Sequence, residues 1–536
     1  MRLRPTCLAI AAATLLGVPP TAASTVAAAG PTRDVLVGVR SGSDRGSIRS
    51  QARALGVTPT EIYVSSRAFA THVSAQQAER LERDPRVTEV IDDDLLAGIS
   101  GLDDADSKIV GRPARERLRR QVTPRWLKRI GITRVDRRLG SGKHRPAFDA
   151  DVAIIDSGIS RHPDVRTAGG KDCTRSGSWR DGYGHGTGVA SILGGRDNNK
   201  GIVGVVPGVR LWSVRIFDSR GRTRLSWVLC GLDWVARKRD PRDKRRAFFE
   251  GVTLSFSIGD SDARAKPDQK CGTGPVGVVH RAICRIERRG TILVAAAGNY
   301  GQKAAKRLPA SYQEVITVSA LADFDGRPGG RGRQAQACSA GAARERDDRF
   351  ASFSSFGEGV DLIAPGKCIW VAYAGKSYAR VSGTSFAAPM VLGVALRYRK
   401  RYPAAQPNQV RQALIYAGSR RWRVASDPDG FHEPLVDARR LKAPPRFEYG
   451  RVGRRSVARG AAVRVSLRVH RQLGHTARIS IRTAGVPAGV TVAIDGSRVT
   501  IRVRDTAATG RRSVILRASD GEVRRTIRIP IRVTRD

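Results

Sequence analysis

The chain has 536 residues, too many for one hydrophobic core, so two or three domains are expected. Its 95 Lys and Arg against 49 Asp and Glu give a net charge of +46, and such an excess ordinarily points to nucleic acid or another polyanion. The arginines are spread through every segment, however, and aromatic residues do not interleave with them as stacking platforms would. This pattern argues against specific nucleic-acid binding and favours loose adhesion to anionic cell-surface polymers or acidic substrates.

Residues 1–29 have the pattern of a secretory signal peptide. Arg2 and Arg4 precede an apolar run from about Cys7 to Val18, and small residues follow with cleavage expected after Ala23 or Ala29. A membrane anchor is the alternative, but this run is too short to span a bilayer, and no later segment is long and apolar enough. We therefore expect a secreted, extracellular protein without a membrane span.

Six cysteines remain once Cys7 has left with the signal peptide, an even number in an oxidising compartment. A metal site is disfavoured, because no pair has CxxC spacing and no histidine cluster accompanies them. The sequence alone does not fix the disulfide connectivity. Proximity along the chain favours Cys271–Cys284 and Cys338–Cys368, which leaves Cys173 with Cys230.

Residues 31–97 alternate strand and helix signals. DVLVGVR, SIRSQARAL, EIYVSSRAFATHVS, SAQQAERLERD and VTEVIDDD predict a strand, a helix, two strands, a capped helix and a final strand. That order suits a small ferredoxin-like α+β unit. Residues 98–120 then read as a charged linker that ends in the basic pair Arg119 and Arg120.

Residues 121–442 alternate strands rich in Val and Ile with helices, which indicates an α/β domain built on a parallel sheet with helices on both faces. The expected strands are VAIIDSG, RLWSVRIF, GVTLSFS, TILVAAAGN, EVITVSAL and DLIAPG. Helices are expected from about 186 to 194, at SWVLCGLDWVARKR, at about 276–288, and after Ser385.

Residues 445–536 change to short alternating runs with turns at PAG, DGS and DGE, many of whose outward positions are Arg. About seven such strands indicate an all-β, antiparallel sandwich of immunoglobulin-like type. It contains no catalytic constellation, so attachment to a surface, guidance of substrates and simple stabilisation are all open as its role.

Three polar residues of the α/β domain stand in settings that suit nucleophilic catalysis. Ser385, in VSGTSFAAPM, lies where a glycine-bearing turn enters a helix, and a hydroxyl there still needs a base. His185, in GYGHGTGVAS, begins a helix of small residues, and Asp156 ends the strand VAIID, at the sheet edge where such folds bind ligands. Taken singly, each has an ordinary structural reading, as a turn-capping Asp, a helix-capping His and a buried Ser.

Together these motifs resemble the subtilisin family of serine proteases, over roughly Gln121 to Leu441. Asp156, His185 and Ser385 follow the subtilisin order, and KGIVGVVPGV, LVAAAGN and ASFSSFGEGVDLIAPG fall in family order between the last two. Gly188 and Met390 depart from the family, which usually has a His at both positions, but neither belongs to the triad. The resemblance implies a serine endopeptidase in which Asp156 orients His185, His185 is the base for Ser385, and Asn299 helps to bind the oxyanion.

The resemblance also implies a zymogen. Residues 31–97 would be an inhibitor-like pro-segment, cleaved from the peptidase within 98–120, and an independent binding module is the alternative. Substrate would add as a strand near Ser255, Phe256 and Ser257. Arg307 would lie near the floor of the pocket for the residue before the scissile bond, which favours acidic or polar residues there.

A structural Ca²⁺ site is the cofactor that the resemblance implies. Its ligands would be the side chains of Gln121, Asp164 and Asn198 and the main-chain carbonyls of Arg196, Lys200 and Ile202, an all-oxygen set. An ordinary polar turn at DNNKG is the alternative. Two other functions also stay open, a catalytically silent binding protein on the same scaffold and a cationic adhesin.

Overall fold

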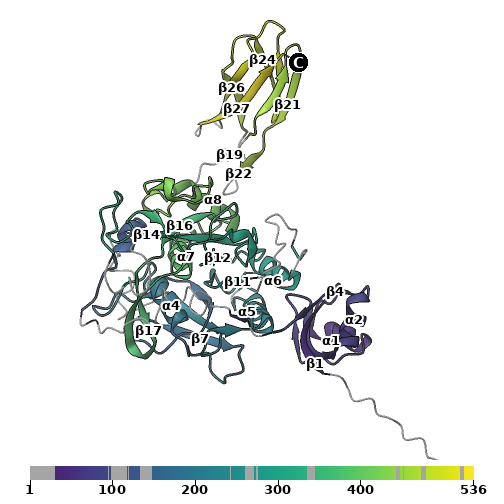
Figure 1. Cartoon of the computed structure of the whole chain (residues 1–536), viewed down its shortest axis with the longest axis vertical. Helices are drawn as coiled ribbons and strands as arrows, with labels where there is room; N and C mark the ends of the chain where they lie inside the picture. Colours follow the sequence, from purple (N-terminus) through teal and green to yellow (C-terminus); the bar gives the residue numbers. More distant parts are fainter. Residues whose placement is uncertain are drawn as a thin grey trace, which may run out of the picture.

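The computed structural model describes residues 31–94, 96–97, 118, 120–132, 148–241, 243–244, 246–259, 271–272, 276–334, 338, 345–441, 447–450, 452–471, 478–519 and 524–535. Figure 1 shows three parts in chain order, a small α+β unit, a large α/β body and a β-sandwich that projects from it. The predicted signal peptide and nearly all of the predicted linker fall outside the described residues.

The small unit is one antiparallel sheet with two helices. Its sheet order is β2-β3-β1-β4. Val35, Val37 and Val39 of the central strand join the core of this unit, whereas Leu36, on the other face, joins a cluster of the α/β body. The unit is therefore packed on the body through one sheet face. Its elements are β1 (Thr32–Val39), α1 (Arg45–Ala54), β2 (Glu61–Tyr63), β3 (Ala68–Ser74), α2 (Ala75–Arg83) and β4 (Val87–Asp92).

The α/β body is built on an eight-stranded sheet in the order β15-β14-β12-β10-β6-β8-β7, with β16 beside β14. All of its pairings are parallel except that of β15 with β14. This confirms the predicted parallel sheet. The strands are β6 (Asp151–Asp156), β7 (Thr167–Asp172), β8 (Arg210–Arg215), β10 (Gly251–Leu254), β12 (Ile292–Ala296), β14 (Ile316–Ala322), β15 (Arg349–Phe350) and β16 (Leu362–Pro365).

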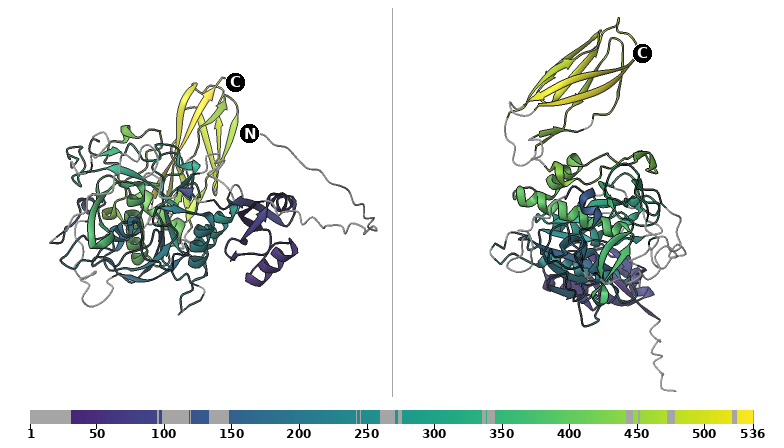
Figure 2. Two further views of the ribbon diagram at one scale, coloured as in Figure 1. Left: turned by 60° about the horizontal axis from the view of Figure 1, so that its bottom comes forward. Right: turned by 90° about the vertical axis from the view of Figure 1, so that its left-hand side faces the viewer.

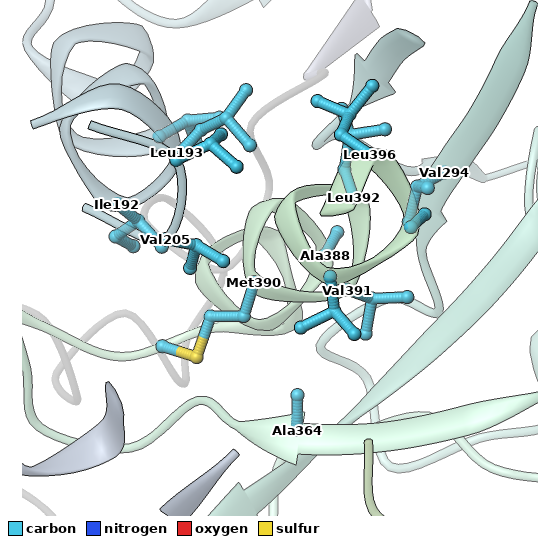
Figure 3. Close-up of a cluster of buried hydrophobic side chains, with 14 of the residues drawn as sticks. Ile192, Leu193, Val205, Val294, Ala364, Ala388, Met390, Val391, Leu392 and Leu396 are labelled. Atoms are coloured by element: carbon cyan, nitrogen blue, oxygen red, sulfur yellow. The ribbon is translucent and has the colours of Figure 1, made fainter. Parts of the chain in front are cut away.

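Helices cover both faces of this sheet. Val152 and Ile154 of β6 belong to a cluster with α4 and α7, whereas Ala153 and Ile155 belong to a second cluster with α5 and α6. Figure 3 shows α7 side chains such as Leu392 lying between α4 and the strands. The helices are α3 (Arg125–Arg129), α4 (His185–Gly194), α5 (Leu225–Arg237), α6 (Gly277–Glu287), α7 (Thr384–Arg401) and α8 (Pro407–Ala417).

Short two-stranded pairs surround the main sheet. β17 (Ile369–Tyr373) and β18 (Ser377–Val381) form a hairpin before α7, and β11 (Ile258–Gly259) pairs with β13 (Arg307–Leu308). A further pair joins two parts of the molecule, because β5 (Leu96–Ala97) adds antiparallel to β9 (Arg222–Thr223) of the body.

The C-terminal part encloses one hydrophobic cluster between a four-stranded sheet, β20-β27-β26-β23, and a three-stranded sheet, β21-β25-β24. It is therefore strand-rich and two-layered, and its immunoglobulin-like type stays a prediction. One pairing is not as expected, since β20 runs parallel to β27. The strands are β19 (Phe447–Tyr449), β20 (Arg455–Ala458), β21 (Ala462–Ser466), β22 (Val469–Arg471), β23 (Ser480–Gly485), β24 (Val490–Asp495), β25 (Arg498–Val503), β26 (Gly510–Ser519) and β27 (Arg524–Thr534).

Three disulfides join the cysteines as chain proximity predicted. Cys173–Cys230, Cys271–Cys284 and Cys338–Cys368 have Cα separations of 5.8, 6.1 and 5.5 Å, within the range for a disulfide. Among the helices that the structure describes, none has the length and apolar character needed to cross a bilayer.

Candidate active site

Asp156 and His185 form a buried pair at the carboxyl edge of the sheet. Asp156 ends β6 with its side chain fully buried, and His185, 6% exposed, is the first residue of α4. His185 Nδ1 lies 2.8 Å from Asp156 Oδ1 and 3.0 Å from Oδ2. An ionised carboxylate at that distance accepts the Nδ1 proton, which leaves the other ring nitrogen, Nε2, as the basic one.

Glycine is required where α4 approaches the turn after Asp156. A Cβ on Gly186 would lie 2.2 Å from the carbonyl oxygen of Gly158 and 3.0 Å from Asp156 Oδ1. Gly184, which precedes the helix, has φ 115°, and a Cβ there would lie 2.5 Å from the Tyr373 ring. The glycines around His185 in the sequence thus allow the imidazole to reach the carboxylate.

Ser385 and Asn299 come together at the start of α7. Asn299 Oδ1 accepts hydrogen bonds from the N–H and the hydroxyl of Thr384, both at 2.8 Å. These bonds fix the amide so that Nδ2 faces the other way, and a Cβ on Gly383 would lie 3.4 Å from both Asn299 Nδ2 and Ser385 Oγ. The amide donor and the hydroxyl therefore border one small space.

The Ser385 segment also meets His185. The ring of Phe386, the next residue, lies 5.0 Å from the His185 imidazole, centroid to centroid. The structure thus brings all four predicted catalytic residues to one end of the sheet, from β6, α4, the turn after β12 and α7.

Asp181 holds this region together, and the sequence interpretation missed it. Its Oδ1 accepts from Ser157 Oγ at 2.8 Å and from the N–H groups of Tyr183 and Gly184 at 2.9 and 2.7 Å. Its Oδ2 accepts from the N–H and hydroxyl of Thr187 at 2.9 and 2.5 Å. One carboxylate therefore caps the first turn of α4 and ties it to the residue after Asp156. No local pattern signalled it, because the N-cap residue of α4 is Gly184 and Asp181 lies three residues before that position.

The predicted substrate strand follows β10. Ser255 is fully buried and its hydroxyl pairs with Thr253 Oγ1 at 2.6 Å, while the Phe256 ring packs at 5.8 Å from Phe217. β9 is already paired with β5, whose Leu96 packs against the cluster that contains Phe256. An extended segment of this same chain therefore occupies the edge of β9 and shares a hydrophobic cluster with the predicted substrate strand.

Arg307 lies beside the turn that carries Asn299. Its guanidinium lies 3.5 Å from the centroid of the Tyr300 ring and donates to Gln302 Oε1 at 3.1 Å. A Cβ on Gly298 would lie 3.1 Å from Ser355 Oγ and 3.2 Å from Ser257 Oγ. Both hydroxyls are buried and have no hydrogen-bond partner in the part of the chain that the structure describes, nor has Arg307 Nε. Polar donors thus gather next to Asn299.

The six predicted Ca²⁺ ligands lie on one loop and its neighbours. Asp164 is fully buried, Oδ2 accepts from the N–H of Ile202 at 2.7 Å, and Oδ1 has no partner among the described residues. Burial raises the pKa of this carboxyl to about 6. Gln121 Oε1 accepts from the N–H of Asn198 at 3.1 Å, and the N–H of Arg196 donates to the carbonyl of Asp164 at 2.9 Å.

This arrangement fits a hard cation in part. The unpartnered oxygen of a buried Asp is the kind of ligand that Ca²⁺ takes, and the surrounding donor atoms are oxygens. Gln121 and Asn198 are turned toward loop N–H groups, because Asn198 Oδ1 accepts from the N–H of Lys200 at 3.1 Å. Both side chains would have to rotate to bind an ion.

Comparisons with known proteins bear on the α/β body. A peptidase model described as "Subtilase family" matches residues 149–433. The chain is 30% identical over 275 residues to a thermostable alkaline protease of Halalkalibacterium halodurans, covering 50% of this chain and 63% of that protein. It is 29% identical over 286 residues to subtilisin BL of Lederbergia lenta, covering 53% and 88%. A crystal structure of a cold-adapted subtilisin-like serine proteinase aligns with 27% identity and a TM-score of 0.42, over 54% of this chain and 89% of that one.

Proposed function

This chain belongs to the subtilase family of serine endopeptidases, and from that premise we propose that it hydrolyses peptide bonds in proteins with Asp156, His185 and Ser385. The observation that carries the proposal is the buried pair of His185 and Asp156, in which Nδ1 lies 2.8 and 3.0 Å from the two carboxylate oxygens. The His185 ring also lies against the ring of Phe386, the residue after Ser385. A hydroxyl, a base and an orienting carboxylate are the parts that acyl transfer needs.

In the proposed reaction, His185 Nε2 takes the proton of the Ser385 hydroxyl as the oxygen attacks the substrate carbonyl. Asp156 holds the imidazole in the required tautomer and stabilises its protonated form. Asn299 Nδ2 and the N–H of Ser385 donate to the oxyanion. The imidazolium then protonates the departing amine as the peptide bond breaks, and water attacks the remaining ester by the same route in reverse.

Hydrolysis of casein tests this function. The wild-type chain should cleave casein, Ser385→Ala should reduce turnover by about 10⁴-fold or more, and the control Ser456→Ala, on the distant β20, should leave it unchanged. Equal hydrolysis by wild type and Ser385→Ala would overturn the proposal. No hydrolysis by any of them would favour the silent binding protein.

Residues 31–97 are proposed to be an inhibitory pro-segment, which makes the full chain a zymogen. Asp93 Oδ1 accepts from the N–H of Ser226 at 2.8 Å, at the start of α5, and Glu89 pairs with Arg281 of α6 at 3.1 Å. The body contributes Asp233, which accepts from the N–H of Ser65 at 2.7 Å. These buried contacts and the β5–β9 pairing would block the substrate edge until the segment leaves.

Maturation should leave a trace at the N-terminus. The wild-type chain should be recovered with a new N-terminus between residues 98 and 120, whereas Ser385→Ala should keep residues 31–97 attached. Cleavage of Ser385→Ala at the same bond would show that another protease processes the chain. A wild-type chain that stays uncut and fully active would count against the pro-segment.

We further propose that the pocket beside Asn299 accepts an acidic residue before the scissile bond. The support is the contact of Arg307 with Tyr300 together with the buried hydroxyls of Ser257 and Ser355, which have no hydrogen-bond partner among the described residues. A carboxylate would accept from these donors, and a charge-assisted hydrogen bond contributes about 1.5–3 kcal/mol, or roughly 10- to 100-fold.

Two peptides that differ only in that residue, Glu or Leu, test the pocket. Arg307→Gln should lower the Glu-to-Leu ratio of kcat/KM at least tenfold, whereas Arg401→Gln, which removes an arginine that lies against the Tyr402 ring at the C-terminal end of α7, should leave it unchanged. A wild-type preference for Leu would refute the acidic pocket and leave the peptidase proposal standing.

Calcium and secretion complete the proposal. Asp164 would hold Ca²⁺ with Gln121, Asn198 and the carbonyls of Arg196, Lys200 and Ile202, and the ion would supply positive charge that fixes this loop, with no part in bond cleavage.

Secretion is supported by the signal-peptide pattern and by the three disulfides, which form in oxidising compartments.

A further inference from the structure

The four-stranded sheet of the β-sandwich has an outer face made largely of arginine. Residues alternate along its strands, so that Ile527, Ile529, Ile531 and Val533 of β27 enter the core and the residues between them face outward. We call this surface the arginine face. Its six exposed arginines are Arg482 on β23, Arg511 and Arg517 on β26, and Arg524, Arg528 and Arg532 on β27.

The strand register places some of these charges directly opposite one another. Arg511 pairs with Arg532 across β26 and β27, and Arg482 pairs with Arg517 across β23 and β26. Like charges at opposed positions destabilise a sheet. The four strands, RSVA, SIRTAG, GRRSVILRAS and RRTIRIPIRVT, contain no Asp or Glu that could compensate them.

The opposite face of the same sandwich is the internal comparison. The three-stranded sheet exposes only Arg464, Arg498 and Arg502, and Asp495 lies directly opposite Arg498. Exposed arginines are about equally frequent on the two faces, with six in strands of 31 residues against three in strands of 17. The arginine face is distinguished by its longer row of arginines, by its two directly opposed arginine pairs and by the lack of a carboxylate within its strands.

We propose that the arginine face binds an extended polyanion whose charges are phosphate groups and which carries no bases. Guanidinium groups bind phosphate oxygens with two parallel hydrogen bonds, and a flat row of them suits a polymer with repeated charges. Nucleic acid is disfavoured, because single strands are bound by stacking on aromatic rings and none of the four strands contains an aromatic residue. The sandwich also projects from the α/β body in Figure 1 and in the right-hand view of Figure 2, which leaves room for a long polymer.

Binding of inorganic polyphosphate to the full-length chain tests the proposal, with Ser385→Ala present throughout to prevent self-cleavage. The test variant carries Arg511→Gln, Arg528→Gln and Arg532→Gln on the arginine face. The matched control carries Arg464→Gln, Arg498→Gln and Arg502→Gln on the other face, with the same change in net charge. Thermal unfolding of both verifies that they fold.

The test variant should bind polyphosphate at least tenfold more weakly at about 0.15 M salt, and the slope of log Kd against log salt should decrease by about two. The control should change Kd less than twofold. Equal weakening by both variants would mean that only net charge matters and would overturn the proposal, as would no weakening by the test variant. A dT oligonucleotide of equal charge that binds tenfold more tightly than polyphosphate would also overturn it. If the test variant does not fold, Arg528→Gln and Arg464→Gln alone give the same comparison, with about a threefold effect expected.

Discussion

The Asp181 carboxylate is predicted to position His185, and the substitution Asp181→Asn isolates that role. In the wild type, Oδ1 accepts three hydrogen bonds and Oδ2 accepts two, both of them from Thr187. With Asn, the amide oxygen can keep the first set, but the NH₂ group then faces the N–H of Thr187, donor against donor. The Thr187 hydroxyl can reverse and accept from the NH₂ group, but the bond from the Thr187 N–H to the carboxylate is lost, and that buried N–H is left without an acceptor.

The expected cost follows from those bonds. The lost bond to a charged group contributes about 1.5–3 kcal/mol, and the unpaired buried N–H costs a further 1–3 kcal/mol, so the first turn of α4 should be destabilised by about 2.5–6 kcal/mol. Relaxation of the loop would then move His185 away from Asp156. Because a displacement of about 1 Å can cost 10²-fold in rate, kcat should fall about 100-fold with KM nearly unchanged.

The assay is peptide hydrolysis at least 20 °C below the melting temperature of each variant. Asp172→Asn is the matched control, since Asp172, at the end of β7, also accepts from a Thr N–H, a Thr hydroxyl and a Ser hydroxyl. A variant with a lower melting temperature but wild-type kcat would show that Asp181 only stabilises the fold. Equal losses of kcat in both variants would refute the positioning role.

Three further predictions concern stability. Chelation should lower the melting temperature of the wild type by roughly 5–10 °C, which is the loss expected for an ion present at about 100 times its Kd. Asp164→Asn should not respond to chelator. A response in Asp164→Asn would place any bound ion elsewhere. Arg129→Met should destabilise the chain by about 3–5 kcal/mol in urea unfolding, because it leaves Asp323 and Asp348, each 2.6 Å from the guanidinium, as buried carboxylates without their cation. The control Arg237→Met breaks an ion pair whose arginine is half-exposed and should cost less than about 1 kcal/mol. Similar costs for the two variants would contradict this reasoning. Burial and the nearby Asp427 raise the pKa of Glu433 above its ordinary 4.5, so the folded state keeps a proton that the unfolded state releases, and stability should decrease as pH rises above 4.5. Melting temperatures measured from pH 5 to 9 should therefore fall more steeply for the wild type than for Glu433→Gln, and parallel curves would count against it.

The sequence predicted the strands, the helices and the residues of the candidate site wherever a local pattern specified them. The runs VAIID and ILVAA became β6 and β12 because continuous apolar residues suit strands that are buried on both faces. The six cysteines paired consecutively along the chain, the first with the second, the third with the fourth and the fifth with the sixth. Asp156, His185, Asn299 and Ser385 lie at or near the ends of such elements, but the resemblance to the subtilisin family was needed to assign them to one site.

Local sequence patterns did not predict the features that depend on pairing between segments distant in the sequence. Asp181 reads as one more polar residue in a glycine-rich loop, because its five donors become its neighbours only when α4 begins at His185. The arginine face depends on strand register, which decides that Arg511 and Arg532 share a side of the sheet. The parallel pairing of β20 with β27 likewise involves residues 76 positions apart, and no turn residue signals it.

The pairing of β5 with β9 has a consequence for when the peptidase becomes active. In the proposed zymogen, Leu96 and Ala97 belong to the same polypeptide as the site that they would cover, so their effective local concentration is of millimolar order. Cutting the chain removes this advantage but not the contacts, so the severed segment becomes a dissociable ligand. The peptidase would then become active on dilution. Molecules at high concentration near the point of release would stay inhibited, whereas molecules that have diffused away would be active.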